Sequence, residues 1–359
     1  MERILVINPG STSTKLAIFD GENEVWKESL NHSLEDLQKY KSIYDQIDLR
    51  LDLVYKTMEK HGEDLSKLTA IASRGGPIAP VKSGAYEIND EMIHVAFDHP
   101  QDPHVSILGA IIADKIVKKV GIKAYIYDAV SVDEMYPLCT ITGLPGIRRR
   151  GQGHNLNMRA AALKCCVDDG FDYTKSTLIV SHLGGGISVS LHVNGEIADI
   201  IPDEDGCFAP DRAGNIPQTQ LVELCYSGKY TQKEMISLLK RSGGLVAWLG
   251  TNDTRDVEKM IAGGDEKAKL IYEAMAFVVA ENIGREAPVC FGKVDRIVLT
   301  GGIAYSEYFT RMIAERVSWI APVTIIPGEN EMQALANGVL RVLRGMEIAH
   351  VFHEKHQID

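Results

Sequence analysis

Four glycine-containing turns each follow a short apolar strand of this chain, and glycine lets a backbone approach a ligand closely. The turns lie at Gly10, Gly75-Gly76, Gly184-Gly185-Gly186 and Gly301-Gly302. Backbone N–H groups in such turns converge on an anion, so two turns from different parts of the chain could hold one triphosphate. The composition agrees, because 32 of 359 residues are glycine and only 13 are proline, which indicates turns within ordered structure rather than linkers.

The two common nucleotide-binding glycine motifs are absent from the sequence. Residues 10–15 read G-S-T-S-T-K and lack the glycine that precedes the lysine of a P-loop. No G-x-G-x-x-G opens a helix, which excludes a Rossmann dinucleotide site. One strand followed by glycine is weak support for a phosphate site, since hairpins use glycine for shape alone. Four such turns on a repeated plan are stronger support.

The chain contains an internal repeat at an offset of 174 residues. Residues 4–22 (ILVINPGSTSTKLAIFDGE) align without gaps with residues 178–196 (LIVSHLGGGISVSLHVNGE). Each copy reads as an apolar strand, a turn of small residues, a second strand and a tight Asp-Gly or Asn-Gly turn. The repeat predicts two domains built on one plan, which agrees with the length of 359 residues.

Apolar spacing predicts alternating helices and strands after each repeat. A stripe of apolar residues at spacings of three and four predicts one helix over 34–60. We expect further helices near 105–119, 218–225, 232–240, 266–285, 307–317 and from 332, and strands near 68–73, 123–127, 296–299 and 323–326. This order indicates an α/β class with two mixed sheets covered by helices. The Gly-, Pro- and Arg-rich segment 143–153 marks the expected domain boundary.

Charge and apolar runs argue against several partners. The chain has 38 basic and 49 acidic residues, a net charge of -11, so we expect no nucleic acid partner. The apolar run at the N-terminus is too short for a signal peptide or a membrane span, so we expect a cytoplasmic protein without a membrane partner. The six cysteines form no C-x-x-C motif, and we expect reduced thiols.

Three segments resemble the motifs of the acetate and butyrate kinases. Residues 4–15 resemble their first phosphate motif, 181–188 (SHLGGGIS) their second phosphate motif and 299–306 (LTGGIAYS) their adenosine motif. These kinases belong to a superfamily with sugar kinases, heat-shock chaperones and actin. The chain is similar to the butyrate kinase branch in three further segments: 72–76 (ASRGG), where acetate kinases carry a histidine before the two glycines, 128–133 (DAVSVD) and 148–150 (RRR).

This resemblance implies duplicated RNase-H-like (actin-like ATPase) domains, mixed sheets flanked by helices and an active site in the interdomain cleft. It implies an N-terminal domain of residues 1–152, completed by a C-terminal helix within 334–359, and a nucleotide-binding domain of residues 153–333. The implied reaction is reversible phosphoryl transfer from ATP to a short-chain fatty acid, giving acyl phosphate and ADP, with Mg²⁺ as cofactor. The resemblance also implies a homo-oligomer, a dimer or a multiple of it.

An ionised carboxylic acid needs no protein base to attack a phosphoryl group, but the two anions must be brought together. By resemblance, Arg74, His154 and Arg212 surround the transferring phosphoryl group. An arginine in such a position is worth about 10³ to 10⁵ in rate. Taken alone, Arg212 reads more simply as a loop residue paired to Asp211, and His154 as a surface or helix-capping histidine.

Magnesium prefers oxygen ligands and keeps most of its water, so one or two carboxylates suffice. Asp128, which also belongs to the implied catalytic set, and Glu331 resemble the metal-side residues, with Glu329 as the alternative to Glu331. Strand alternation predicts that Lys15 points into solvent, an alternative to a phosphate contact. The ATP contacts implied by the resemblance are Asn8, Ser11, Ser13, Lys15, His182, Gly184, Gly185, Gly186, Gly301, Gly302 and Ala304.

Small residues stand where acetate kinases close a small apolar pocket. Ser73 and Gly153 match positions that carry valine and phenylalanine in those enzymes, and His104 resembles a substrate-side histidine. The smaller residues predict room for a longer or branched chain, at about 0.8 kcal/mol per buried CH₂. This favours butyrate or isobutyrate over acetate or propionate.

Two functions from other classes stay open at this point. A sugar or polyol kinase of the same superfamily needs an aspartate to take a hydroxyl proton, a role that Asp128 could fill. That reading gives Arg74, His154 and Arg212 no role. An ATPase module of the chaperone or actin type is a binding or filament protein, and we expect none here because the polar tail 350–359 is short.

Overall fold

The computed structural model describes residues 2–354, and the chain folds as two compact units. The first unit runs to Asp133 and resumes at Asn330, and the second comprises Glu134–Glu329. The segment 134–152, expected in the N-terminal domain, therefore clusters with the second unit. Its backbone and side chains bind strand β9 (Glu196–Ile201), since Tyr136 donates its N–H to the Ala198 carbonyl over 2.8 Å and Arg149 pairs with Asp199 at 2.9 Å.

In its described residues, the first unit contains a seven-stranded mixed sheet in the order β12-β5-β6-β4-β1-β2-β3. The first three strands form an antiparallel meander, and β4 and β6 extend the sheet in parallel with β1. The strands are β1 (Arg3–Pro9), β2 (Ser13–Asp20), β3 (Asn23–Asn31), β4 (Ala70–Arg74), β5 (Ala85–Glu87), β6 (Lys123–Tyr127) and β12 (His350–Val351).

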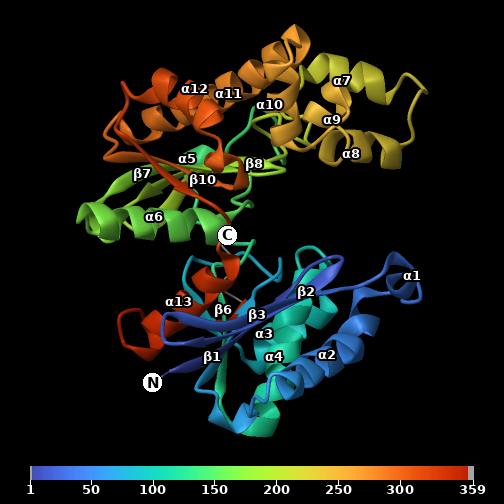
Figure 1. The fold of residues 1–359 in the computed structure, drawn as a ribbon, viewed down its shortest axis with the longest axis vertical. Helices are drawn as coiled ribbons and strands as arrows, with labels where there is room; N and C mark the ends of the chain where they lie inside the picture. The colour runs from blue at the N-terminus through green and yellow to red at the C-terminus, as the bar shows by residue number, and fades with distance from the viewer. Residues whose placement is uncertain (1, 355–359) are drawn as a thin grey trace. The chain divides into compact units, whose positions relative to one another are not determined.

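Helices cover both faces of this sheet, with α4 (Leu108–Val120) on one face and α13 (Glu331–Leu343) on the other (Figure 1). Close approach explains two glycines in these helices. A Cβ on Gly109 of α4 would lie 2.5 Å from Ser73 Oγ, and one on Gly338 of α13 would lie 2.5 Å from the Tyr127 ring. The other helices are α1 (Leu34–Leu37), α2 (Ile47–Lys60) and α3 (Asp90–Asp98).

The prediction of one continuous helix over 34–60 is wrong. The chain leaves the helical conformation after α1 and re-enters it through a 3₁₀ turn at Ile43–Gln46, which leads into α2. A capping box starts this turn, because Ser42 Oγ accepts from the Tyr44 N–H and the Asp45 carboxylate accepts from the Ser42 N–H. The apolar stripe continues across the break, so its period alone does not reveal the interruption.

The described part of the second unit contains a five-stranded mixed sheet in the order β11-β10-β7-β8-β9. It repeats the first sheet's plan, because the antiparallel hairpin of β7 (Thr177–Leu183) and β8 (Ile187–Val193) continues into β9, while β10 (Arg296–Gly301) and β11 (Val323–Pro327) extend the sheet in parallel with β7. The predicted duplicated α/β architecture is confirmed.

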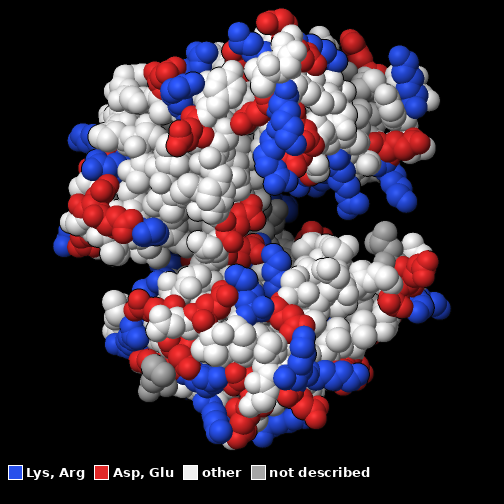
Figure 2. All heavy atoms as spheres, viewed as in Figure 1, with Lys and Arg blue, Asp and Glu red and all other residues white. Residues whose placement is uncertain are grey.

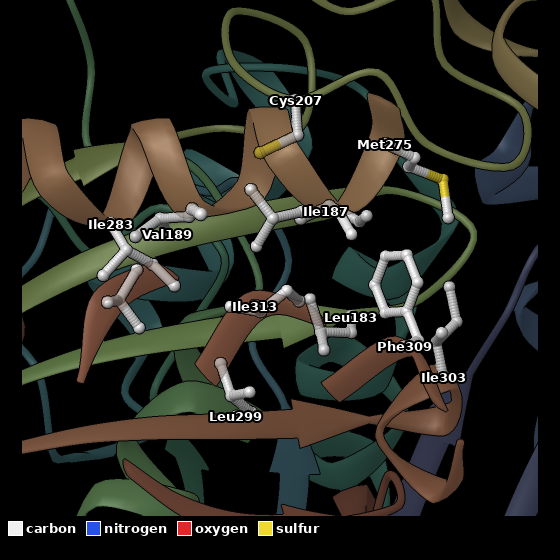
Figure 3. Close-up of a cluster of buried hydrophobic side chains, with 14 of the residues drawn as sticks. Leu183, Ile187, Val189, Cys207, Met275, Ile283, Leu299, Ile303, Phe309 and Ile313 are labelled. Atoms are coloured by element: carbon white, nitrogen blue, oxygen red, sulfur yellow. The ribbon is translucent and has the colours of Figure 1, made fainter. Parts of the chain in front are cut away.

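Helices α11 (Glu266–Glu286) and α12 (Glu307–Val317) lie on one face of this sheet and α6 (Asn155–Asp169) on the other (Figure 1). Figure 3 shows the core beneath α11, where Val189 of β8 lies beside Ile283 of that helix and Ile187 lies farther along the strand. The remaining helices of this unit are α5 (Pro137–Thr140), α7 (Gln218–Cys225), α8 (Gln232–Lys240), α9 (Gly244–Leu249) and α10 (Thr254–Ala262).

Acidic and basic side chains are interspersed over the surface that Figure 2 shows. Within residues 2–354, no helix has the length and apolar character needed to cross a bilayer.

Candidate active site

The glycine turns after β7 and β10 line one pocket of the second unit, with a volume of about 740 Å³. Gly184, Gly185 and Gly302 come from these turns. Gly302 opens the 3₁₀ turn Gly302–Tyr305, in which Ala304 is buried. The other lining residues come mainly from the start of α10 and from the loop before α12: Pro210, Asn252, Asp253, Thr254, Arg255, Glu258, Ile303, Tyr305, Ser306 and Glu329.

Backbone crowding explains why glycine occupies these turns. Gly301 has φ of +92°, and a Cβ there would lie 2.4 Å from the Leu183 carbonyl oxygen. A Cβ on Gly186 would lie 2.2 Å from an Asp203 carboxylate oxygen. The turn after β10 therefore lies directly against Leu183 of β7, and a side chain at Gly301 or Gly186 would collide with its neighbours.

Two histidines from different elements lie beside the second phosphate turn. His154 precedes α6, and His182 is near the end of β7; their rings stack at a centroid distance of 3.9 Å. His154 makes no capping hydrogen bond through its side chain; instead, its Nδ1 lies 2.9 Å from Ser188 Oγ. The capping alternative for His154 is therefore wrong.

The tautomer of His182 follows from its two neighbours. The amide of Asn157 donates to Nδ1 over 2.8 Å, so Nδ1 carries no proton and the N–H lies on Nε2. Nε2 faces Glu329, with its oxygen at 3.3 Å. His182 is buried and Glu329 is half-exposed on the pocket wall, so the ring presents a proton donor near the glycine turn.

Arg212 is held in the second unit by two carboxylates and a carbonyl. Its Nε donates to Asp203 over 3.0 Å, and Nη1 donates to Asp211 over 2.6 Å and to the Lys240 carbonyl. Burial raises the pKa of Asp211, against the lowering effect of Arg212. The pairing with Asp211 that the sequence suggested is present, and the Asp211 N–H also bonds the Gly185 carbonyl at 3.3 Å, which joins Arg212 to the glycine turn.

In the first unit, the carboxyl ends of β1 and β4 meet the start of α13 at one cluster. Glu331, the first residue of α13, accepts hydrogen bonds from Arg74 of β4 and from the Asn8 amide of β1, the latter at 2.9 Å. Burial works against ionisation of Glu331, but the Arg74 charge and the hydrogen bonds from Arg74 and Asn8 hold the pKa of this carboxyl below its ordinary value. Glu331 is thus an ionised, partly buried carboxylate.

The first phosphate motif forms a tight turn in which the Gly10 N–H bonds the Ser13 carbonyl at 2.7 Å. Ser11 is exposed and Ser13 half-buried. Lys15 is exposed, as strand alternation predicts, and sits opposite Asn8 in the hairpin register. Its charge also contributes to the lowered pKa of Glu331. Lys15 therefore lies in solvent yet near the Arg74–Glu331 cluster.

Asp128, expected at the metal, and Ser73, expected in the substrate pocket, are both buried. Asp128 is 3% exposed, adopts a φ of +41°, and accepts the Gly84 N–H through Oδ1 at 2.7 Å. Ser73 is fully buried, with its hydroxyl directed to the carbonyls of Ile7 and Arg74 on the side of the sheet that α4 covers. The structure does not bring either side chain to an open surface.

The other two expected pocket residues are placed by their neighbours. A Cβ on Gly153 would lie 2.5 Å from Ile200 Cδ1, so Ile200 occupies the space that a larger side chain would need. His104 caps a 3₁₀ turn by accepting the Ser106 N–H at Nδ1, which leaves the ring proton on Nε2. Contacts with Ile200 and Ser106 therefore set the positions of Gly153 and His104.

Sequence reasoning missed several polar residues of the second unit. Asn157 and Ser188, which orient the two histidines, lie within segments that the motifs already marked, three residues after His154 and two after Gly186. Glu258 and the 252–255 segment of the pocket lie far in sequence from the four strand–glycine turns, and no spacing signal identified them.

Comparison with known proteins agrees with this architecture. A model of the acetokinase family matches residues 146–320. The chain is 45% identical over 349 residues to butyrate kinase 2 of Clostridium acetobutylicum, an alignment that covers 97% of this chain and 98% of that protein. The chain belongs to the acetokinase family. Membership makes it a carboxylate kinase, as the motifs predicted, and implies ATP as the phosphoryl donor.

Solved structures of more distant proteins share the fold of this acetokinase-family chain. Acetate kinase of Porphyromonas gingivalis has a TM-score of 0.81 at 18% identity, covering 96% of this chain and all of that one. A propionate kinase of Francisella tularensis has a TM-score of 0.76 at 19% identity, covering 94% of this chain and 99% of that one. At such identities the likeness concerns the fold.

Proposed function

We propose that this carboxylate kinase transfers the γ-phosphoryl group of ATP to butyrate or its branched isomer isobutyrate, giving acyl phosphate and ADP. The observation that carries the choice of acid is the 45% identity, over nearly the whole chain, to a protein named butyrate kinase. The reaction forms a bond between an acid oxygen and the γ-phosphorus and breaks the bond to the β–γ bridging oxygen. The acid is already ionised, so no proton has to be removed.

The nucleotide is proposed to bind in the pocket of the second unit. Its volume of about 740 Å³ suits a nucleotide, and glycine turns from two strands border it. We assign the phosphates to Gly184, Gly185 and Gly186 with the His182 Nε2–H as a donor, and the nucleoside to the turn of Gly301, Gly302 and Ala304. Asn8, Ser11, Ser13 and Lys15 of the first unit are assigned to the terminal phosphates.

Charge cancellation is the proposed role of Arg74, His154 and Arg212. Two arginines and an imidazole donor placed at the equatorial oxygens of the transferring group stabilise the charge that develops there. The geometry supports prior positioning, since Arg74 and Arg212 are each held by carboxylates and His154 is held by Ser188. These three side chains then need little movement to reach their positions in the transition state.

The carboxylates of the first unit fit a magnesium ion. Glu331 is ionised at neutral pH and partly exposed, and Mg²⁺ accepts one or two carboxylates while keeping phosphate oxygens and water. When bound, the ion neutralises the β- and γ-phosphate charge. We assign Glu331 to the metal side. Asp128 is buried and accepts the Gly84 N–H, and its place on the metal side rests on the family resemblance alone.

We propose that acid length is set at Gly153 of the second unit and at Ser73 and His104 of the first unit, the substrate-pocket residues that the family resemblance implies. Ile200, itself fully buried, packs against Gly153 and leaves no room there for a larger side chain. Each CH₂ buried there contributes about 0.8 kcal/mol. A cytoplasmic location and a homo-oligomeric assembly remain predictions of the sequence.

One assay tests the proposal directly. The protein is incubated with MgATP, hydroxylamine and each straight or branched acid of two to six carbons, and acyl hydroxamate is measured. We expect the highest kcat/KM with a four-carbon acid. Absence of product with every acid contradicts the carboxylate kinase function, and a maximum at acetate contradicts the assignment of butyrate.

A further inference from the structure

Glu258 is a carboxylate on the wall of the second-unit pocket that the phosphoryl-transfer chemistry does not use. It lies on α10 and joins two other helices. One oxygen, Oε1, accepts the Tyr272 hydroxyl of α11 at 2.9 Å and the Ser306 hydroxyl at 2.5 Å. Ser306 in turn caps α12 by accepting the Phe309 N–H at 3.0 Å. The carboxylate is therefore fixed by three helices at the edge of the pocket.

The hydrogen-bond donors around Glu258 indicate which of its two carboxylate oxygens is available to a ligand. Both hydroxyl donors reach the same oxygen, and among the described residues Oε2 receives no hydrogen bond. Burial, followed by the hydrogen bond to Glu258, raises the pKa of Tyr272, so its hydroxyl remains a donor at neutral pH. Glu258 is half-buried on the pocket wall, so Oε2 is an acceptor that a donor on a bound ligand can reach.

The other carboxylates on the wall already have donors. Asp253 caps α10 through the Arg255 N–H and forms an ion pair with the same arginine at 2.6 Å. Glu329 faces the His182 Nε2 at 3.3 Å, next to the phosphate turn. Of the three acidic residues that line the pocket, Glu258 is thus the one whose second oxygen is available to the sugar or base of a nucleotide.

We propose that Glu258 determines nucleoside recognition by accepting a hydrogen bond from a ribose hydroxyl of the bound nucleotide. This inference rests on the proposed nucleotide site. Ribose hydroxyls are donors, and a carboxylate is the acceptor that nucleotide sites in other folds use for them. Tyr272 holds the carboxylate without lining the pocket, so it is a positioning residue, whereas Glu258 contacts the ligand.

Binding of diphosphates tests the proposal without any acid substrate. Isothermal titration with ADP, 2′-deoxy-ADP and 3′-deoxy-ADP is compared between the wild type and Glu258→Leu, which keeps the volume but removes the acceptor. The wild type is expected to bind one of the deoxy analogues about 10- to 100-fold more weakly than ADP. In Glu258→Leu the ADP affinity falls by a similar factor and the discrimination against that analogue disappears.

Two variants separate a direct contact from a structural effect. Tyr272→Phe removes a donor to Oε1 and is expected to retain the wild-type discrimination, while Glu258→Gln, with one amide oxygen, is expected to retain part of it. Thermal melting reports whether each variant folds. Equal binding of ADP and both deoxy analogues by the wild type, or unchanged discrimination in Glu258→Leu, overturns the proposal.

Further measurements distinguish failure of the ribose assignment from failure of the proposed kinase function. If Glu258→Leu loses discrimination between ADP and inosine diphosphate instead of between ADP and a deoxy analogue, the carboxylate contacts the base and the ribose assignment is wrong. If the wild type forms acyl hydroxamate yet shows no ribose discrimination, only the present inference fails. A wild type that binds no nucleotide and forms no hydroxamate overturns both.

Discussion

The imidazole rings of His154 and His182 lie face to face, with centroids 3.9 Å apart and planes 13° from parallel. Ser188 binds Nδ1 of one ring, and Asn157 binds Nδ1 of the other. Ser188 lies on β8 and Asn157 on α6, so two separate elements of the second unit set the orientation of the stacked rings.

Replacement of His154 by Ala is expected to lower kcat by about 10² to 10⁴, because a donor to the transferring group is lost. Ser188→Ala should have a smaller effect of about tenfold, since the ring remains but its orientation is less restricted. Hydroxamate formation at saturating substrates measures both values. Turnover near wild type in His154→Ala removes this histidine from the proposed mechanism.

Arg212→Ala is expected to lower kcat by about 10³ or more, on the scale of an arginine that stabilises a phosphoryl transition state. Arg212→Lys should recover a small part of this, because it keeps the charge but loses the forked geometry held by Asp203 and Asp211. Arg241→Ala, an exposed arginine at the end of α8, is the matched control and should leave kcat unchanged. Equal losses in the 212 and 241 variants contradict a specific role.

The turns and periodic elements were predictable from sequence because each depends on local residue types. The strand–glycine turns at Gly10 and Gly184 were found, and helices 218–225, 232–240 and 307–317 have the predicted bounds. The break before α2 was missed, because a capping box at Ser42 interrupts the helix while the apolar stripe continues. Local sequence therefore predicts elements better than their interruptions.

Contacts between distant segments could not be predicted from one sequence. Asn8 meets Glu331 across 323 positions, and Arg149 reaches Asp199 across 50, and no local pattern marks either pair. The resemblance to a family supplied Arg74 and Glu331 as separate residues, but their ion pair appears only in the folded unit. Ser73 illustrates the converse, since its small size suggested an open pocket and the fold buries it against Gly109.

Gly301→Ala is expected to destabilise the protein by at least about 2 kcal/mol, since a φ of +92° and a contact of 2.4 Å with the Leu183 carbonyl both disfavour a side chain. ATP affinity should fall as the two turns separate. Gly284→Ala, within α11 and with no atom near the added Cβ, should instead preserve or raise stability. Urea unfolding compares the two, and an unaltered midpoint in Gly301→Ala contradicts the crowding of the turns.

Acid should destabilise this protein partly through His192. This ring is fully buried between Tyr173 and Ser190, and burial lowers its pKa to about 3. The unfolded state takes up a proton near pH 6.5 while the native state does not, so the free energy of unfolding falls as pH decreases from about 6.5 towards 3. Urea midpoints between pH 7.5 and 4.5 should decline less steeply in His192→Gln. Parallel curves for the two proteins exclude this contribution.

Glu331 and Glu329 can be separated by their dependence on magnesium. Glu331 is ionised beside Arg74 and Asn8, whereas Glu329 lies beside His182 on the pocket wall. Glu331→Gln is expected to raise the Mg²⁺ concentration for half-maximal activity by about tenfold or more and to lower kcat, because the amide is a weaker ligand for a hard cation.

Glu329→Gln should leave the magnesium dependence unchanged and should maintain or lower the KM for ATP, since it removes a negative charge near the phosphates. Hydroxamate formation across a magnesium titration at fixed ATP measures both variants. Glu331→Gln also leaves the Arg74 guanidinium without its carboxylate, which lowers the free energy of unfolding by about 1 to 3 kcal/mol. Thermal melting detects this cost separately from the metal effect. A shifted magnesium requirement in Glu329→Gln with none in Glu331→Gln assigns the metal side to Glu329 instead.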